Sequence, residues 1–162
     1  MEQNKVVGLH KEKHAKTKIS SVRPFNHIAQ EHMLPVVVHE FVVAGAEFPV
    51  VFVKDPASER FQSVVLLGLA ARQNLLIKED KWDAMYVPRV VRNYPLLLVQ
   101  EDPNSDRLIV AIDEASERVN EAEGFPLFND DGSESEFLTV RKQQMGEYVD
   151  FAQITQAFVE KL

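Results

Sequence analysis

The chain of 162 residues contains no cysteine, only six glycines and a single tryptophan. Without cysteine there is no disulfide, no thiolate metal site and no cysteine nucleophile, and the redox compartment is left undetermined. The glycines are scattered and form no phosphate-binding loop, and the chain has neither a nucleophile elbow nor a His-Glu-x-x-His zinc motif. The biochemical activity is therefore unknown at this stage. Whether the protein is an enzyme stays open, and no cofactor is predicted.

Long apolar runs are also missing. No stretch approaches the ~18 apolar residues of a membrane span, and the first residues lack the apolar segment of a secretory signal. We therefore expect a cytoplasmic protein without a membrane span. A length of 162 residues is typical of one domain, and 45% hydrophobic residues are enough to form a core. We expect a single α+β domain over residues 1–162, with residues 1–18 a polar basic tail and residues 133–162 a C-terminal helical segment.

The charge is acidic overall and unevenly distributed. Residues 1–23 hold six Lys and Arg against two Glu, which gives this segment a net charge of +4. Because the whole chain has a net charge of −7, residues 24–162 carry a net charge of −11. Twelve of the acids lie in residues 101–136, where Arg107 and Arg118 are the only Lys or Arg. An acidic body repels a phosphate backbone, so we expect no nucleic-acid partner.

Two similar stretches, residues 48–61 and 94–108, organise the chain. Each opens with an aromatic residue and a proline, continues through an apolar run, and turns at Asp-Pro-x-Ser-acid-Arg before a second apolar run. Such short aliphatic runs, bounded by turn residues, are typical of buried strands. The proline cannot donate to a strand ladder and should stand at the strand's start. The pattern predicts two proline-led β-hairpins in a mainly antiparallel sheet, packed by short helices.

Three helices are expected around these hairpins. One covers residues 38–47, and a short one begins at Pro88 and ends near Asn93. Ser133 and Glu136 have the spacing of a capping box and predict the start of the C-terminal helix. Its apolar stripe is interrupted at Gly146, which indicates one kinked helix or two segments. The stripe either packs on the sheet or contacts a protein partner or a second copy of the chain.

One cluster of residues could bind a ligand. Trp82 and Tyr86 precede Arg89 and Arg92, which share a face at i, i+3 on a short helix. Two guanidinium groups beside aromatic rings could hold a carboxylate or a phosphate. The competing interpretation, which we favour, is that the aromatic residues belong to the core and that the arginines bond strand-end carbonyls or acidic loops.

The histidines give no strong metal signal, and no metal site is predicted. His10 and His14 have the spacing of a helical metal pair, but no third ligand lies at a motif distance, so we expect surface histidines. His27, His32 and His39 could converge with Glu40 or Glu47 only through an unusual loop. Histidines at the surface or in the core are the favoured interpretation.

A family resemblance rests on several short segments. The chain resembles the bacterial SapC family in Phe48-Pro49-Val50-Val51-Phe52, Leu66-Leu67-Gly68-Leu69, Asn74-Leu75-Leu76, Trp82 with Tyr86-Val87-Pro88, Arg92-Asn93-Tyr94-Pro95 and Ile112-Asp113-Glu114. The match covers nearly the whole chain. It departs at Leu76, Asn93 and Leu96, where the family commonly has other residues. Members usually continue past this C-terminal helix, so the resemblance is to a short member or to part of a longer one.

The resemblance implies little about activity, because it brings no catalytic motif. The family name implies association with a surface layer, and some members are encoded near flavin-dependent halogenases. Two hypotheses follow. The preferred one is a non-enzymatic accessory or protein-interaction protein. The alternative is a small-molecule-binding protein or an enzyme working beside an oxidoreductase, with Trp82, Tyr86, Arg89 and Arg92 holding an anion.

Overall fold

The computed structural model describes residues 5–56, 58–102 and 105–161. Contacts divide the chain into two compact units, one formed by Met1–Arg23 with Asn93–Gly146 and the other by Pro24–Arg92 with Glu147–Leu162. The long helix α3 (Glu136–Val159) begins in the first unit and ends in the second. The single domain expected from the length stays a prediction, because a division by contacts does not show whether either unit folds alone.

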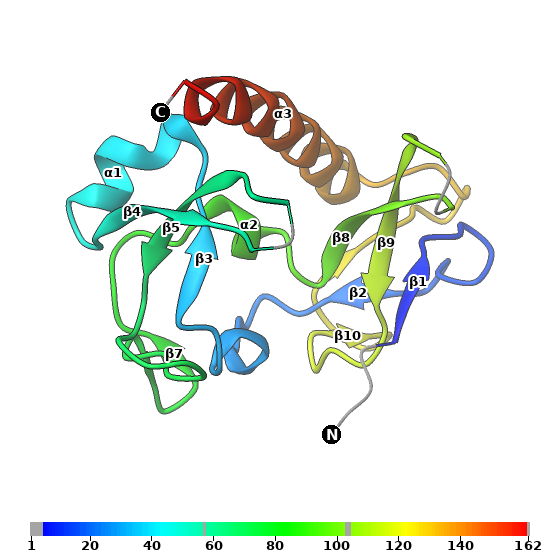
Figure 1. The fold of residues 1–162 in the computed structure, drawn as a ribbon. Helices are drawn as coiled ribbons and strands as arrows, with labels where there is room; N and C mark the ends of the chain where they lie inside the picture. The colour runs from blue at the N-terminus through cyan, green and yellow to red at the C-terminus, as the bar shows by residue number, and fades with distance from the viewer. Residues whose placement is uncertain (1–4, 57, 103–104, 162) are drawn as a thin grey trace. The chain divides into compact units, whose positions relative to one another are not determined.

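The first unit is built on the later of the two hairpins (Figure 1). β8 (Leu96–Gln100) pairs antiparallel with β9 (Leu108–Asp113), and β1 (Val6–Gly8) adds to the other side of β9. A second small sheet has the order β10-β2-β11, formed by Val119–Asn120, Lys18–Ile19 and Phe125–Pro126. The core of this unit consists of Ile19, Leu96, Ile112, Leu127, Phe128, Leu138 and Met145.

The second unit is built on the earlier hairpin. β4 (Val50–Lys54) pairs antiparallel with β5 (Phe61–Leu66), and β3 (Met33–Pro35) adds to the other side of β5. A short hairpin of β6 (Ile77–Lys78) and β7 (Lys81–Trp82) follows. The helical elements are the 3₁₀ turns η1 (Asn26–Ile28) and η2 (Val38–Glu40), α1 (Phe41–Gly45) and α2 (Arg89–Arg92). The core consists of Ile28, Leu34, Val36, Ala44, Phe48, Val65, Leu67 and Val91.

The two hairpins are completed in the same way. In each unit the three-stranded sheet has an N-terminal strand beside the second hairpin strand, in the orders β1-β9-β8 and β3-β5-β4. The proline that precedes each hairpin has no N–H to donate, but its carbonyl oxygen accepts a backbone hydrogen bond. Leu66 N donates to Pro49 O and Asp113 N donates to Pro95 O, each at 3.0 Å. The predicted α+β class with proline-led antiparallel hairpins is confirmed, and the strands are divided among separate small sheets.

Both hairpin turns are closed by a backbone bond to the arginine of the turn sequence. Asp55 N donates to Arg60 O at 2.8 Å, and Glu101 N donates to Arg107 O at 3.0 Å. In the first turn the Asp55 carboxylate also accepts the Ser58 hydroxyl at 2.6 Å, as expected of an aspartate before a turn. Ala57 in the first turn and residues 103–104 in the second lie outside the described residues.

The predicted helices are present, but the predicted cap of the last one is wrong. α3 runs without interruption through Gly146. Its N-cap is Ser135, whose Oγ accepts the Leu138 amide at 3.1 Å and donates to Pro126 O at 2.6 Å. Ser133 is held instead by the Asp131 carboxylate, which accepts its amide at 2.8 Å and its hydroxyl at 2.6 Å. Because Glu134 forms an antiparallel bridge with Phe128, Ser133 lies in the loop before the helix, and Ser135 takes the N-cap position.

The expectation of a surface position is also wrong for His14, although His10 is exposed. His14 lies within residues 1–18, the stretch assigned above to a polar basic tail, and its side chain is only 4% exposed. Its Nε2 lies 3.2 Å from Glu114 Oε1. Glu114 also pairs with Lys13 at 2.5 Å and with Lys5 at 2.8 Å, and these bonds lower its pKa to about 2. The basic segment is thus attached to the end of β9 by one carboxylate.

Candidate functional site

Trp82, the first of the four predicted ligand residues, belongs to the core of the second unit. Its ring lies 5.6 Å from that of Phe25 and 5.9 Å from that of Phe48, measured between centroids. The indole Nε1 donates to the carbonyl oxygen of Tyr86 at 2.8 Å, which satisfies its only polar group. Trp82 is half-buried, packs against this core and positions the backbone of Tyr86.

The other three residues gather around a carboxylate that the sequence analysis did not place among them. Glu40, the last residue of η2, is 1% exposed. Its Oε1 accepts the Tyr86 hydroxyl at 2.6 Å and the Arg89 amide at 2.8 Å. Its Oε2 accepts the Val37 amide at 3.1 Å. A buried charge is stable only when it is hydrogen-bonded, and three donors meet that requirement here.

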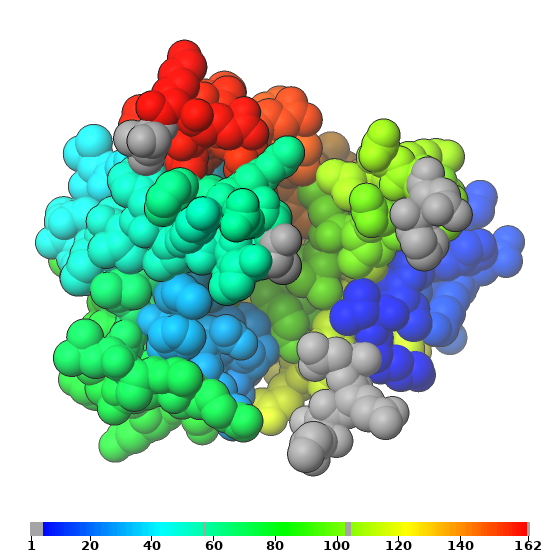
Figure 2. All heavy atoms as spheres, viewed as in Figure 1, coloured from blue at the N-terminus to red at the C-terminus, as the bar shows by residue number. Residues whose placement is uncertain are grey.

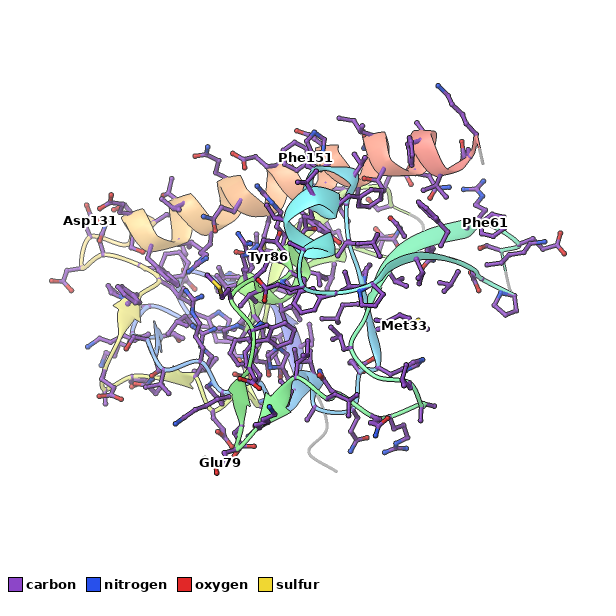
Figure 3. All side chains as sticks on the ribbon, turned by 90° about the vertical axis from the view of Figure 1, so that its left-hand side faces the viewer. Met33, Phe61, Glu79, Tyr86, Asp131 and Phe151 are labelled. Carbon is purple, nitrogen blue, oxygen red and sulfur yellow. The ribbon has the colours of Figure 1, made fainter. Side chains whose placement is uncertain are left out.

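These bonds join elements that are distant in sequence. Glu40 ends the 3₁₀ turn that leads into α1, whereas Tyr86 and Arg89 lie where the chain enters α2. Figure 3 shows Tyr86 in the interior of the second unit, beneath the helix that carries Phe151. The Arg89 amide belongs to the first turn of α2 and would otherwise lack a helical partner. Glu40 thus holds the start of α2 against η2.

Each of the two guanidinium groups already has a partner within the protein. Arg92 Nε donates to Val87 O at 2.6 Å, and its guanidinium carbon lies 4.8 Å from the centre of the Tyr86 ring. Arg89 lies 3.6 Å from a carboxylate oxygen of Glu147 and covers the Phe151 ring at 5.1 Å. The two side chains therefore point to different partners and do not form one shared face for an anion.

The hydroxyl groups of this cluster are held in the neutral form. Burial, followed by the hydrogen bond to Glu40 and its charge, raises the pKa of Tyr86 well above its usual value near 10. Burial and the same carboxylate raise the pKa of Tyr148 to about 12. Both hydroxyl groups therefore stay protonated at neutral pH.

The sequence did contain a signal for Glu40. It is the one acid in the run Val36-Val37-Val38-His39-Glu40-Phe41-Val42-Val43, in which every other residue except His39 is apolar. A lone carboxylate in such a run must find donors when it is buried. The adjacent His39 is exposed, and its ring stacks on Phe151 with a centroid distance of 3.8 Å, so the two side chains diverge.

Within residues 5–56, 58–102 and 105–161, no three His, Cys, Asp or Glu side chains are grouped as metal ligands. Two open cavities lie in the first unit, with volumes of about 580 Å³ and 310 Å³. Neither is lined by Trp82, Tyr86, Arg89 or Arg92.

A cluster of three phenylalanine rings lies at the surface of the second unit. Phe41 of α1, Phe52 of β4 and Phe158 of α3 have mutual centroid distances of 6.0–6.4 Å. Figure 2 shows the elements that carry them, α1, the β4–β5 hairpin and the last turns of α3, at the same surface of this unit. Phe52 is 39% and Phe158 is 43% exposed. Rings of this size are normally covered, so the cluster is a candidate contact surface.

The structure thus defines an α+β protein of two units, each with a three-stranded antiparallel sheet, in which the polar cluster around Glu40 is internally satisfied. The chain belongs to the SapC family, whose model matches residues 9–162. No curated protein and no solved structure matched the chain. In the described part of the chain, no helix combines the length and the apolar character needed to cross a membrane.

Proposed function

We propose that this SapC-family chain is a non-enzymatic interaction protein that associates with a second copy of itself through the apolar surface of its second unit. The observation that carries the proposal is the ring cluster of Phe41, Phe52 and Phe158, in which Phe52 and Phe158 are exposed. We call the wider surface the aromatic patch and define it by the ring cluster together with the exposed apolar residues Val42, Val43, Phe61 and Ile154.

The exposure of the aromatic patch is what an interface requires. Val42 is 87% exposed and Ile154 52% exposed, and they flank rings that touch one another. Interface cores are enriched in aromatic side chains because these bury a large area with little loss of conformational freedom. A cluster of large rings with two members exposed is uncommon in a monomer that has no partner.

The charge of the chain favours this surface for contact between copies. The net charge is −7, so two molecules repel each other over most of their surfaces. The seven residues of the aromatic patch are all uncharged. A two-fold contact uses the same patch on both molecules, and a stable one buries ~800 Å² on each. The last turns of α3, which carry Ile154 and Phe158, are then the part of the helical stripe that self-associates.

The alternative of an anion-binding or enzymatic site at Trp82, Tyr86, Arg89 and Arg92 has less support. A ligand would have to compete with Glu147 and Phe151 for Arg89, and with Val87 O for Arg92. Trp82 lies in the core and has no free polar group to contribute. None of these contacts favours an enzyme that works beside an oxidoreductase.

Sedimentation velocity over a concentration series tests the proposal. We expect the molar mass to rise from that of one chain, 18.4 kDa, toward twice that value. The double variant Phe52→Ser with Phe158→Ser should remain a monomer over the same range. Leu69→Ser is the matched control, because Leu69 is 90% exposed in the same unit but outside the aromatic patch. A wild-type mass that stays at one chain, or an equal effect of the control, would refute the proposal.

A further inference from the structure

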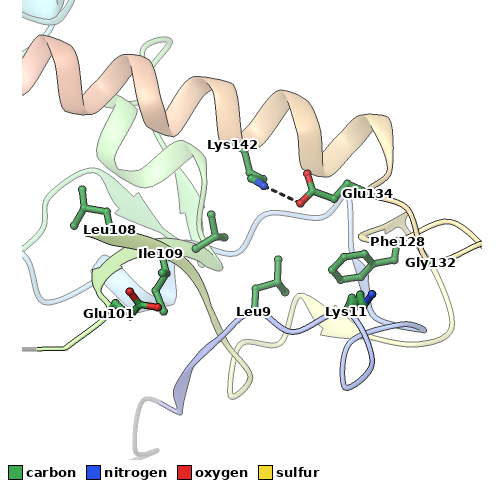
Figure 4. A pocket seen from close by; sticks show the side chains of 10 residues that line it. Leu9, Lys11, Glu101, Leu108, Ile109, Phe128, Gly132, Glu134 and Lys142 are labelled. Carbon is green, nitrogen blue, oxygen red and sulfur yellow. Dashed lines mark hydrogen bonds and ion pairs between the residues drawn. The ribbon is translucent and has the colours of Figure 1, made fainter. Parts of the chain in front are cut away.

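The first unit contains a cavity that the proposed contact surface does not use. Its volume is about 580 Å³, within the range of ~300–1,000 Å³ typical of small-molecule sites. It is lined by Leu9, Lys11, Glu101, Leu108, Ile109, Val110, Phe128, Gly132, Glu134 and Lys142. Figure 4 shows Leu108, Ile109 and Glu101 toward one end of the cavity and Lys11, Phe128 and Gly132 toward the other. All of these residues belong to the first unit.

The floor of the cavity is aliphatic. Leu108 and Val110 of β9 present their side chains on the same face of the strand, whereas the side chain of Ile109, between them, lies on the opposite face near Gly8. Leu9 follows β1, and its amide donates to Val110 O at 2.9 Å, which continues the pairing of these two strands. Because the floor is part of a hydrogen-bonded sheet, its shape is fixed before any ligand arrives. Leu108 is 41% exposed, so part of this apolar surface is open to solvent.

The wall at the other end is a loop with its own hydrogen bonds. Phe128 and Glu134 form an isolated antiparallel bridge, and Asn129 N donates to Ser133 O at 2.8 Å. Gly132 occupies a positive φ of 79°, and nothing lies within 4 Å of the place where a Cβ would be. These bonds hold the Phe128 ring in place at this end.

Of the charged residues that line the cavity, one lysine has no ion pair with a described residue. Lys142 pairs with Glu134 at 2.7 Å, and Glu101 pairs with Arg107 at 3.4 Å. Lys11 has neither an ion pair nor a side-chain hydrogen bond with any described residue, although it lines the cavity. The end that holds Lys11, Glu134 and Lys142 therefore carries one uncompensated positive charge.

We infer that this cavity binds an aliphatic carboxylate, with the carboxylate at Lys11 and the hydrocarbon chain along Leu9, Val110 and Leu108. The aliphatic floor favours an unbranched chain, and the single free ammonium group favours one negative charge. The inference is independent of the proposed self-association, since the aromatic patch lies in the other unit.

Isothermal titration with decanoate, below its micellar concentration, tests the inference on the full chain. Decanol and decylammonium of the same length are the comparison ligands, and octanoate tests the contribution of the chain. We expect decanoate to bind more tightly than either comparison ligand. Affinity should fall roughly two- to fourfold for each methylene removed. Methyl chemical shifts should move at Leu9, Leu108 and Val110.

Lys11→Met separates the role of the charge from that of the apolar floor. It should weaken decanoate about fivefold, equivalent to ~1 kcal/mol, and leave decanol unchanged. Lys16→Met is the matched control, because Lys16 is exposed on the same segment and outside the cavity. Absence of decanoate binding, equal affinity for decanol, tighter binding of decylammonium or an equal effect of Lys16→Met would overturn the inference.

Discussion

The Tyr86 hydroxyl donates to Glu40 Oε1 at 2.6 Å, across 46 positions of sequence. The carboxylate is 1% exposed and accepts two further backbone bonds, from Val37 and Arg89. A polar group so fully bonded contributes to the unique arrangement of the second unit, because its loss leaves buried donors without acceptors. Tyr86 and Arg89, two of the residues predicted to bind a ligand, therefore also stabilise the fold through Glu40.

Replacing Glu40 tests this structural role. Glu40→Gln keeps the shape of the side chain but substitutes an NH₂ group for one acceptor, so at least one of the three donors loses its partner. We expect the free energy of unfolding to fall by ~2–3 kcal/mol. Urea denaturation measures this loss, and the slope of the free energy of unfolding against urea concentration should be the same for both proteins.

Tyr86→Phe completes the comparison. It should cost about 1–2 kcal/mol, since it removes the hydroxyl and retains the ring beneath Arg92. In the double variant the two effects should not add, because the two side chains are in direct contact within one hydrogen-bond network. Additive losses, or a Glu40→Gln protein as stable as the wild type, would show that the bond contributes little.

The three tyrosines should ionise late. Burial raises the pKa of Tyr86, Tyr94 and Tyr148, that of Tyr148 to about 12. An acid whose pKa is raised by folding contributes stability below its unfolded value near 10, and this contribution is lost as the pH rises through the folded value. We expect little tyrosinate absorbance near pH 10 and a steep rise on alkaline unfolding. A transition near pH 10 in the folded protein would contradict these environments.

Glu114 should give the protein an acid-dependent stability. Its hydrogen bonds to Lys13, Lys5 and His14 lower its pKa from 4.5 to about 2. A carboxylate whose pKa is lowered by folding stabilises above the unfolded value, and the contribution disappears as the pH falls from about 4.5 to 2. Glu114→Gln should lose ~1 kcal/mol near pH 6, a value kept small because its lysine partners are largely exposed.

Urea denaturation at several pH values checks this expectation. The difference between Glu114→Gln and the wild type should shrink toward pH 2. Glu117→Gln is the control, since Glu117 is exposed and makes no such pairs among the described residues. A difference that does not change with pH would rule out the ionised carboxylate as its source.

The start of α3 offers a test of the corrected cap. Ser135→Ala removes the acceptor for Leu138 N and the donor to Pro126 O, and should cost about 1–2 kcal/mol. Ser133→Ala leaves both bonds intact and should cost less than half as much. Thermal unfolding of the two variants distinguishes them, and a larger loss for Ser133→Ala would restore the cap expected from sequence.

The hairpins and helices were predictable because their signals are local. Proline after an aromatic residue fixes where β4 and β8 begin, and Asp-Pro with Ser and Arg fixes where the chain reverses. Pro88 similarly indicates the start of α2. The wrong cap arose because Ser133 and Ser135 are both suitable residues, and only the bridge between Phe128 and Glu134, which keeps Ser133 in the loop, decides between them.

The rest depends on partners that are distant in sequence. The strand β1 pairs with β9, about a hundred residues later in the sequence. His14 is buried against Glu114 at a similar separation in sequence. No spacing rule connects such pairs. Glu40 was visible as a lone acid among apolar residues, but two of its three donors lie 46 and 49 positions away. The cavity beside Lys11 likewise forms only when four separate segments come together.

Hydroxyl-radical footprinting at low and high protein concentration tests the proposed self-association most directly, because it reads side-chain exposure at each residue. Phe52, Ile154 and Phe158 should be oxidised less at high concentration, as the aromatic patch is covered. Leu69 and Met85, which are 90% and 96% exposed, should be oxidised equally at both. Equal oxidation of the aromatic patch at both concentrations, or protection at Leu69 or Met85 in its place, would contradict the account.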